Sequence, residues 1–448
     1  MTLEEVGIYG LIAATGFLWV RFNHRTLNDA FSPLSLLLFF WVLPYLGSLL
    51  KLSGFQHGLT FEGHALVLSA TLGMIFPSLA TAYVLRRSRL TFSLDRFQVS
   101  PLQYSAGRRL AIVLLMAAVL AYVQAVFVGR GIPLAEYAAG RATAANLHQA
   151  GMRSKLQVLA FAVHIAGAMV LYLGLTSRQR WTRFGFFALA AVPPILGILR
   201  ALKGDVFMSL LYYAAVLYYY RRSRNLRLPM VRTLMVGILL VSALALITTL
   251  RSSGQGNPTF YSQLIAFKYS GLPFPVNEIL GVVYGYTSLT FENFARFLEY
   301  GDHQLRLGTS MFRPLFSVFM QGRIPDSMLA GVDWHFVAPF ANAPNGLTEL
   351  YAEGGPLLTI IGPLVYGLLF NLIYLRFRRS GSTTWLFIYI NFLFPWVWMF
   401  FTNAFSVLGF YVNAFYVVAI AACAEWIVRW VHVTRGQAVT RVAAPQTP

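Results

Sequence analysis

Charged residues are scarce in this chain: Asp, Glu, Lys and Arg make up 11% of its 448 residues, whereas 57% are hydrophobic and 15% are aromatic. A water-soluble domain needs about a quarter of its residues charged to cover its surface. This composition therefore excludes a soluble enzyme, and its hydrophobicity excludes a disordered chain. The single cysteine, Cys423, lies in an apolar run, which excludes a disulfide scaffold and a zinc-cluster module.

Several catalytic motifs are also missing. The sequence has no GxxxxGK[ST] phosphate loop, which excludes an ATP-driven motor. It has no HExxH or CxxC spacing, so no metalloprotease or zinc site is predicted. It has no DxD pair, which argues against a transferase that holds a nucleotide sugar through a divalent ion. The sequence thus predicts neither a metal nor a cofactor.

What the chain does contain is a series of long apolar runs. A helix of about 20 apolar residues crosses roughly 30 Å of hydrocarbon, and eleven windows approach that length. The predicted fold is an all-α polytopic membrane protein, a single integral membrane domain over residues 1–448. The windows are 6–20, 33–50, 63–85, 109–128, 155–175, 184–199, 206–220, 232–250, 346–375, 383–401 and 404–428. The first window is short, and 184–220 allows either one hairpin or two separate spans. The start of the chain is acidic, so we expect the first window to remain as a span.

The basic residues predict the orientation of these spans. The formal net charge is +19, and one alternate set of connections, with the tail from residue 429, carries 22 of the 35 Lys and Arg but only three acidic residues when Glu425, just before the tail, is included. Because basic loops stay in the cytoplasm, we expect the N-terminus outside and the C-terminus inside. We interpret the basic runs as topology signals that touch anionic membrane lipids, with RNA or protein binding as the minor alternative.

The stretch 251–345, between the eighth and ninth windows, is the only large non-spanning segment, and we expect function within or beneath it. In FENFARFLEY, Phe291, Phe294, Phe297 and Leu298 have helical spacing, with Glu292, Arg296 and Glu299 on the other side. This pattern predicts a helix on the membrane surface. The run 311–320 is apolar but too short to cross, so we expect a re-entrant or interfacial element there. The alternative is a loop that only caps the bundle.

Cations cluster at the predicted outer helix ends. The connection between the sixth and seventh windows is only LRALKGD, so Arg200, Lys203 and Asp205 must lie near the outer surface, and Arg251 ends the eighth window at a similar level. Such charges suggest an anionic partner, and together the cations could hold a diphosphate. The alternative is internal pairing, in which Asp205 neutralises Lys203. Arg306 and Arg313 are further candidates for phosphate or sugar contact.

The start of the ninth window carries carboxylates. Asn345, Glu349 and Glu353 are spaced i, i+4, i+8, so a helix that has begun by Asn345 places them on one face. Carboxylates on an apolar helix must point into a cavity, where one could act as a general base for a sugar hydroxyl. The alternative is helix capping. Other candidates share this side: His335 and His303 for proton transfer, and Asn342 with Asn345 for sugar hydroxyls. We expect His57 and His64 at the surface and His164 in the core.

These features favour a substrate that is already activated in the membrane, because an outward-facing site has no nucleotide sugar to use. A polyprenyl-diphosphate sugar has an apolar tail for the lipid, an anionic leaving group for the cations and a hydroxyl acceptor for the carboxylate.

The run PNGLTELYAEGGPLLTIIGPLVYGLL and the segment RALKG at 200–204 resemble the O-antigen polymerase (Wzy-type) family, also called oligosaccharide repeat unit polymerases. Glu349 and Tyr351 match the family's Glu-Leu-Tyr segment, and Arg200 with Gly204 matches its basic and glycine motif. Glu353 and Gly354 replace the usual aromatic residue, a departure from the family pattern. The layout matches over the whole chain in outline.

The resemblance implies a C-type (GT-C) membrane glycosyltransferase of the bacterial inner membrane. Its activity would be metal-independent, inverting polymerisation of undecaprenyl-diphosphate-linked repeat units at the periplasmic face, as in lipopolysaccharide biosynthesis. Glu349 would be the base, with His335 and Glu353 as further catalytic candidates; Arg200, Lys203, Arg251 and Arg313 would bind diphosphate, and Asn342, Asn345 and Tyr351 would bind sugar. Binding of a chain-length regulator protein stays open, and no nucleic acid is expected.

Three alternatives remain. The ten-residue separation of His335 and Gly346 is also seen in O-antigen ligases, whose acceptor is lipid A core. A lipid-linked oligosaccharide flippase would move the same substrate without breaking a bond, but no internal repeat is visible. A structural subunit of an envelope complex would not need clustered charges at the outer helix ends.

Overall fold

The computed structural model describes residues 3–22, 29–87, 105–128, 131–141, 157–224, 226, 261–273, 276–301, 345–404 and 407–442. These residues are almost entirely helical and contain no sheet, only an isolated antiparallel bridge between Ser53 and Phe267. The helices are α1 (Leu3–Phe22), α2 (Pro33–Leu37), the π-helical turn η2 (Leu38–Val42), α3 (Leu43–Ser48), α4 (Phe61–Arg87), α5 (Ser105–Val126), α6 (Pro133–Ala138), α8 (Gln157–Ala160), α9 (Val163–Thr176), α10 (Arg180–Leu199), α11 (Lys203–Ser223), α13 (Tyr261–Leu264), α14 (Val276–Thr287), α15 (Leu289–Tyr300), α18 (Gly346–Ser380), α19 (Thr383–Trp398) and α20 (Leu408–Val442).

The all-α prediction is confirmed, and helices coincide with every predicted apolar window except 232–250, which lies outside the described residues. In the described part of the chain, five helices are long and apolar enough to cross a membrane: α4, α5, α10, α18 and α20. A total of eleven spans stays a prediction. In the 184–220 region, α10 and α11 are separate helices packed on each other. The last helix, α20, continues beyond the predicted apolar window 404–428, to Val442.

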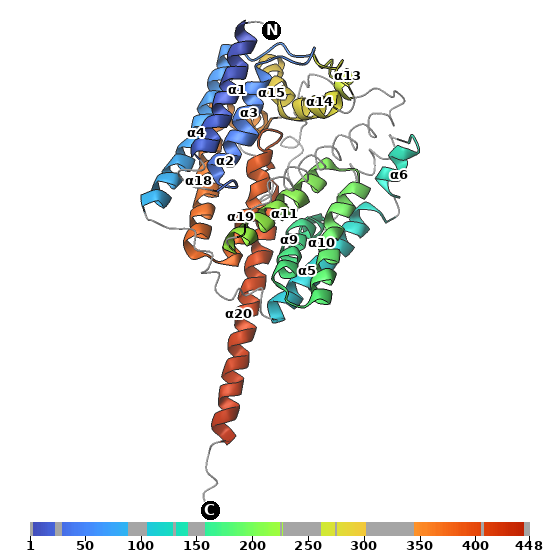
Figure 1. Cartoon of the computed structure of the whole chain (residues 1–448), viewed down its shortest axis with the longest axis vertical. Helices are drawn as coiled ribbons and strands as arrows, with labels where there is room; N and C mark the ends of the chain where they lie inside the picture. The colour runs from blue at the N-terminus through green and yellow to red at the C-terminus, as the bar shows by residue number, and fades with distance from the viewer. Residues whose placement is uncertain are drawn as a thin grey trace, which may run out of the picture.

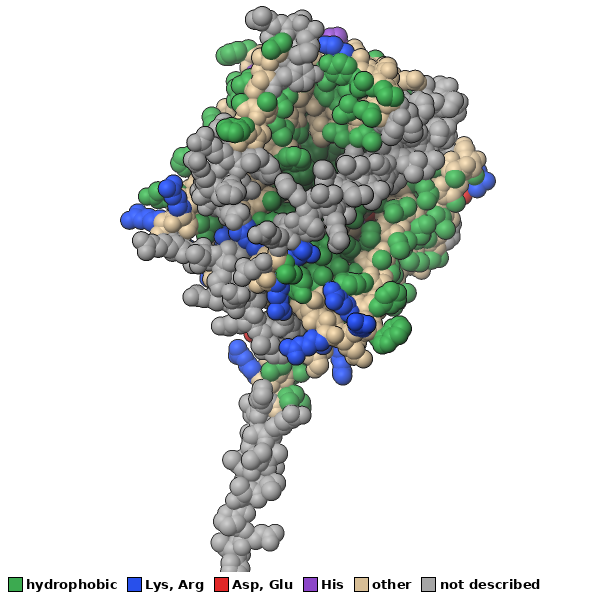
Figure 2. Space-filling model, viewed as in Figure 1, with side chains coloured by type: hydrophobic (Ala, Val, Ile, Leu, Met, Phe, Trp, Pro, Cys, Tyr) green, Lys and Arg blue, Asp and Glu red, His purple; other side chains and the backbone are tan. Residues whose placement is uncertain are grey.

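The two ends of the bundle differ in charge. The N-terminus and the C-terminus lie at opposite ends, and α20 projects beyond the body (Figure 1). Lys and Arg side chains gather toward the end from which α20 projects (Figure 2). The distribution agrees with the grouping of basic connections in the sequence, since the C-terminal ends of α4, α11 and α18 each carry adjacent arginines.

Close packing of α4 against α18 forms one side of the bundle. The contact depends on small residues: a Cβ added at Gly367 would lie 3.3 Å from the Cα of Met74 and 3.4 Å from the carbonyl oxygen of Gly73. Without side chains at these positions the two helix backbones can approach, as is common in membrane bundles. These two nearest atoms belong to the backbone of α4, so they cannot move aside as the end of a flexible side chain could.

Replacing Gly367 by leucine should therefore push α4 and α18 apart and destabilise the protein by about 1–3 kcal/mol, the usual effect of overpacking. Thermal unfolding of the detergent-purified protein measures this. Gly185→Leu is the matched control, since a Cβ at that helical glycine meets nothing within 4 Å. Equal melting temperatures for the two variants would contradict the packing argument.

The helices α13, α14 and α15 lie together at the end of the bundle where the N-terminus is found (Figure 1). The helix predicted from FENFARFLEY is confirmed as α15, and Phe291, Phe294 and Phe297 are buried. Phe291 packs against Trp41, with ring centroids 5.4 Å apart. The placement of Glu292 on an outward polar face was wrong. Its carboxylate is buried and accepts hydrogen bonds from the backbone N–H groups of His57 (2.8 Å) and Gly58 (3.0 Å).

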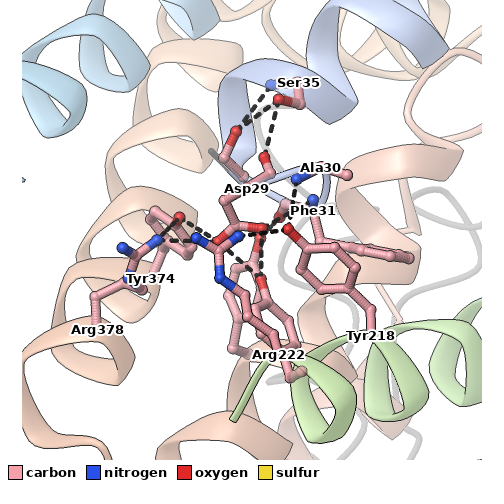
Figure 3. A network of polar contacts seen from close by, with 11 residues as sticks. Asp29, Ala30, Phe31, Ser35, Tyr218, Arg222, Tyr374 and Arg378 are labelled. Atoms are coloured by element: carbon pink, nitrogen blue, oxygen red, sulfur yellow. Dashed lines mark hydrogen bonds and ion pairs between the residues drawn. The ribbon is translucent and has the colours of Figure 1, made fainter. Parts of the chain in front are cut away.

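A second polar network lies near the C-terminal ends of α11 and α18 and joins these two helices (Figure 3). Asp29 is fully buried and its carboxylate accepts hydrogen bonds from the Tyr374 hydroxyl at 2.6 Å and from Arg378 Nη1 at 3.0 Å. The hydroxyl of Tyr219 lies 3.3 Å from both carboxylate oxygens, and the backbone N–H of Phe31 donates at 3.0 Å. The segment before α2 is thereby held to the C-terminal turns of two long helices.

Candidate functional site

The connection between α10 and α11 brings three predicted site residues together. Arg200 is the C-cap residue directly after α10, Ala201 has a left-handed backbone (φ 54°), and α11 begins at Lys203. This tight reversal places Asp205, in the first turn of α11, beside Arg200. Arg200 Nη1 lies 2.9 Å from Asp205 Oδ2, and both residues are buried.

Asp205 is the centre of a buried polar cluster. The Tyr122 hydroxyl of α5 donates to Asp205 Oδ2 at 2.5 Å, and His164 Nε2 of α9 lies 3.9 Å from Oδ1. The other ring nitrogen of His164 is 2.8 Å from the Ser209 hydroxyl, so the prediction of a core histidine is confirmed. Burial alone would lower the pKa of the Arg200 guanidinium, but Asp205 and Tyr122 hold it above its ordinary value. Arg200 therefore carries its charge in a site of low polarity.

The alternative in which Asp205 neutralises Lys203 differs from the observed pairing, because Asp205 pairs with Arg200. Lys203 reaches in another direction. Its ammonium group donates to the hydroxyl of Tyr286 and lies 3.9 Å from the centroid of that ring. This contact ties the start of α11 to α14.

Arg200→Ala should lower the free energy of unfolding by about 3 kcal/mol, the low end for breaking a buried ion pair, because Tyr122 still donates to the Asp205 carboxylate that loses its cation. The double substitution Arg200→Ala with Asp205→Ala should recover part of that loss, which a thermal double-mutant cycle measures. Arg180→Ala, at the exposed opposite end of α10, is the control. Additive losses in the cycle would contradict the coupling of Arg200 and Asp205.

The start of α18 carries the predicted carboxylates. Asn345 is the N-cap, and its side-chain oxygen accepts from the Leu347 N–H at 3.0 Å, so the helix begins where the spacing argument required. Glu349 lies in the first turn of α18, the position that the capping alternative requires, but its carboxylate accepts hydrogen bonds from another element. Its Oε1 accepts from the hydroxyl of Thr402 and from the backbone N–H of Asn403, 3.2 Å away. The side chain thus points toward the α19–α20 connection.

Glu353 lies one turn further along α18 and is buried. The helix is kinked directly after it, at Gly354 and Gly355, where Gly355 has φ 61° and ψ −154°. Only glycine adopts that conformation readily. The GlyGlyPro run therefore separates the first two turns of α18, which hold both carboxylates, from its long apolar part.

The other predicted site residues either lie away from Glu349 or fall outside the described residues. Tyr351 packs on α15, with its ring 6.4 Å from Phe294 and 6.2 Å from Phe297, and so lies on the other side of α18 from Glu349. His335, Asn342, Arg251, Arg313, His303, Arg306 and the run 311–320 lie outside the described residues. His57 is exposed, as predicted, and His64 is half-buried, with its Nδ1 2.8 Å from the Tyr45 hydroxyl.

Lys203 and Glu349 are linked by a continuous series of contacts. The Tyr286 ring that receives Lys203 is stacked on Phe401, with centroids 5.8 Å apart and planes at 21°. The next residue, Thr402, donates to Glu349. All five side chains are half-buried. Figure 2 shows the surface hollowed below α14, the helix that carries Tyr286, with hydrophobic side chains on its visible walls.

Sequence reasoning missed Tyr122, Tyr286, Thr402 and Asn403. The one signal for the last two was a polar pair in the short connection between two apolar windows. In the part of the chain that the structure describes, no group of three or more His, Cys, Asp or Glu side chains could hold a metal ion.

Comparison of the chain with protein-family models, with curated proteins and with solved structures finds no match in any of the three.

Proposed function

We propose that this protein is a membrane glycosyltransferase that lengthens a glycan carried on undecaprenyl diphosphate by joining lipid-linked repeat units. The observation that carries the proposal is the series of contacts from Lys203 through Tyr286, Phe401 and Thr402 to Glu349. It puts a cation and a carboxylate on one half-buried, partly aromatic wall. A lipid-linked glycosyl diphosphate needs an anion-binding group, an apolar or aromatic surface and a base.

In the proposed reaction, Glu349 takes the proton from the acceptor hydroxyl as that oxygen bonds to the anomeric carbon of the donor sugar. The bond from the same carbon to the diphosphate oxygen breaks, and undecaprenyl diphosphate leaves with its electron pair. Lys203 would stabilise the negative charge that grows on the leaving group. Arg200 would contribute less directly, since its charge is balanced by Asp205. Arg251 and Arg313 complete the cation set of the proposal.

The proposal includes a placement in the membrane. The end with α14 and α15 would face the periplasm and the arginine-rich end the cytoplasm of a bacterial inner membrane, with eleven spans and a GT-C-like arrangement. The Lys and Arg distribution supports this orientation.

Transfer by the purified protein tests the proposal. Protein in nanodiscs is supplied with lipid-linked repeat units from its host, and we expect longer lipid-linked glycans, with one undecaprenyl diphosphate released per bond formed. Elongation only when lipid A core is added would identify a ligase instead. Binding and translocation without any longer glycan would identify a flippase.

A further inference from the structure

The connection between α19 and α20 joins the two halves of the candidate site. Phe401 stacks on the ring that holds Lys203, while Thr402 and Asn403 both donate to Glu349. We propose that Phe401, Thr402 and Asn403 are positioning residues, which orient the Glu349 carboxylate and fix its place relative to Lys203. The roles of base and phosphate-binding cation rest on the proposed function, whereas the orientation itself does not.

The hydrogen bonds are distributed unequally over the carboxylate. The Thr402 hydroxyl and the Asn403 N–H both end on Oε1. Within the described residues, Oε2 of Glu349 is thus the oxygen left to accept a proton from another molecule. A carboxylate anchored at one oxygen presents the other in a single direction, which is what a general base requires.

The connection between α19 and α20 is hydrogen-bonded to both parts of α18, before and after its kink. The side-chain amide of Asn403 donates to the Tyr366 hydroxyl at 3.1 Å, beyond the kink of α18. Before the kink, the Gly346 N–H donates to the carbonyl of Met399 at 3.1 Å. Because the connection is hydrogen-bonded to α18 both before and after the kink, Thr402 and Asn403 cannot shift without moving relative to both parts of that helix.

Within the part of the chain that the structure describes, few other charges act on Glu349. Glu353 on the same helix acts on it electrostatically, and the phenol of Tyr366 lies nearby. Neither α19 nor the connection carries a charged residue or a histidine. On α4, Glu62 faces Tyr351 on the other side of α18, and on α15 the carboxylate of Glu292 is bound to the backbone of His57 and Gly58. Among the described residues, the donors from the connection are therefore the groups that favour the ionised form of Glu349.

A test that needs no catalysis follows. Dicyclohexylcarbodiimide reacts with protonated carboxylic acids, so the pH at which half of Glu349 is labelled, measured by peptide mass spectrometry on the full-length protein in nanodiscs, reports its protonation. Thr402→Val has the same shape but no donor, and we expect it to move this midpoint upward by about one pH unit, the size of one lost charge-assisted hydrogen bond. Thr402→Ser retains the hydroxyl and should leave the midpoint unchanged.

An unchanged midpoint in Thr402→Val would overturn the inference. Failure of wild-type Glu349 to react between about pH 5 and pH 9 would do so as well, because the presented oxygen must be reachable. Glu349→Gln should remove the label from this position and serves as the assignment control.

Kinetic measurements on the same kind of variants distinguish this inference from the proposed function. If the protein elongates glycans, Thr402→Val should lower kcat about tenfold at pH 7, leave KM for the lipid-linked unit within about twofold and move the acidic limb of the pH profile upward. Phe401→Leu should instead raise KM without moving that limb. If Thr402→Val shifts the labelling midpoint but the wild-type protein elongates no glycan, the positioning role of Thr402 stands and the glycosyltransferase proposal is rejected. Elongation by Thr402→Val with wild-type kcat and pH profile would reject the positioning alone.

Discussion

Replacing Asp29 by alanine should lower the free energy of unfolding by about 3–5 kcal/mol, the usual loss when one partner of a buried ion pair is removed. Asp29 is fully buried, and the Arg378 guanidinium that it pairs with at 3.0 Å is 5% exposed. The substitution would leave a buried positive charge and would remove the acceptor used by Tyr374 and Tyr219. We therefore expect a melting temperature well below that of the wild type in thermal unfolding of the detergent-purified protein.

Two comparisons make this result specific. Asp29→Asn retains the size and one acceptor oxygen, and should be intermediate. The double substitution Asp29→Leu with Arg378→Met removes both charges, and should recover much of the loss, because a buried ion pair is often replaceable by apolar residues. Glu299→Ala, at an exposed position of α15, is the surface control. A melting temperature for Asp29→Ala equal to that of this control would contradict the network shown in Figure 3.

The helices could be predicted because a membrane allows an apolar segment few backbone conformations. In hydrocarbon each backbone N–H and C=O must be satisfied within its own segment, so a long apolar run has few alternatives to a helix. The start of α18 was equally predictable, since Asn345 is a strong N-cap residue before an apolar periodic run. Periodicity also predicted the helix α15 with its phenylalanines on one face, but it did not predict that they are buried against the rest of the protein.

The partners of the charged side chains were not predictable in this way. Arg200, Lys203 and Asp205 lie within six positions, and their order alone allows either cation to pair with the acid. The left-handed turn at Ala201 decides that Asp205 meets Arg200, and no composition rule marks alanine for that conformation. Glu292 was misplaced because its backbone partners, His57 and Gly58, are distant in the sequence.

The two polar clusters occupy opposite ends of the same helices. Lys203 begins α11 and Glu349 lies in the first turn of α18, whereas Tyr219 and Arg378 lie near their C-terminal ends. α11 has 21 residues, which corresponds to about 30 Å, roughly the thickness of the hydrocarbon core. The Asp29 network therefore ties α11 and α18 together at the end opposite to the candidate site.

Glu349→Gln should reduce the rate of glycan elongation about 100-fold or more, the usual contribution of a general base. The amide oxygen of glutamine can still accept from the Thr402 hydroxyl and the Asn403 N–H, so the local structure should remain. What the substitution removes is the ability to take a proton. The loss should therefore appear in kcat, with the abundance and melting temperature of the protein close to those of the wild type.

The length distribution of lipid-linked glycans, made over time by purified protein in nanodiscs, measures this rate. Glu299→Gln makes the same chemical change at an exposed position and should elongate at the wild-type rate. Lys203→Met should raise KM for the lipid-linked unit as well as lower kcat, because a cation on the diphosphate acts in both the ground state and the transition state. Elongation by Glu349→Gln at the wild-type rate would remove Glu349 as the base, even if the purified wild-type protein is a polymerase. A lowered rate that returns when Glu349 is replaced by aspartate, but not when it is replaced by glutamine, would identify the requirement as a carboxylate at this position.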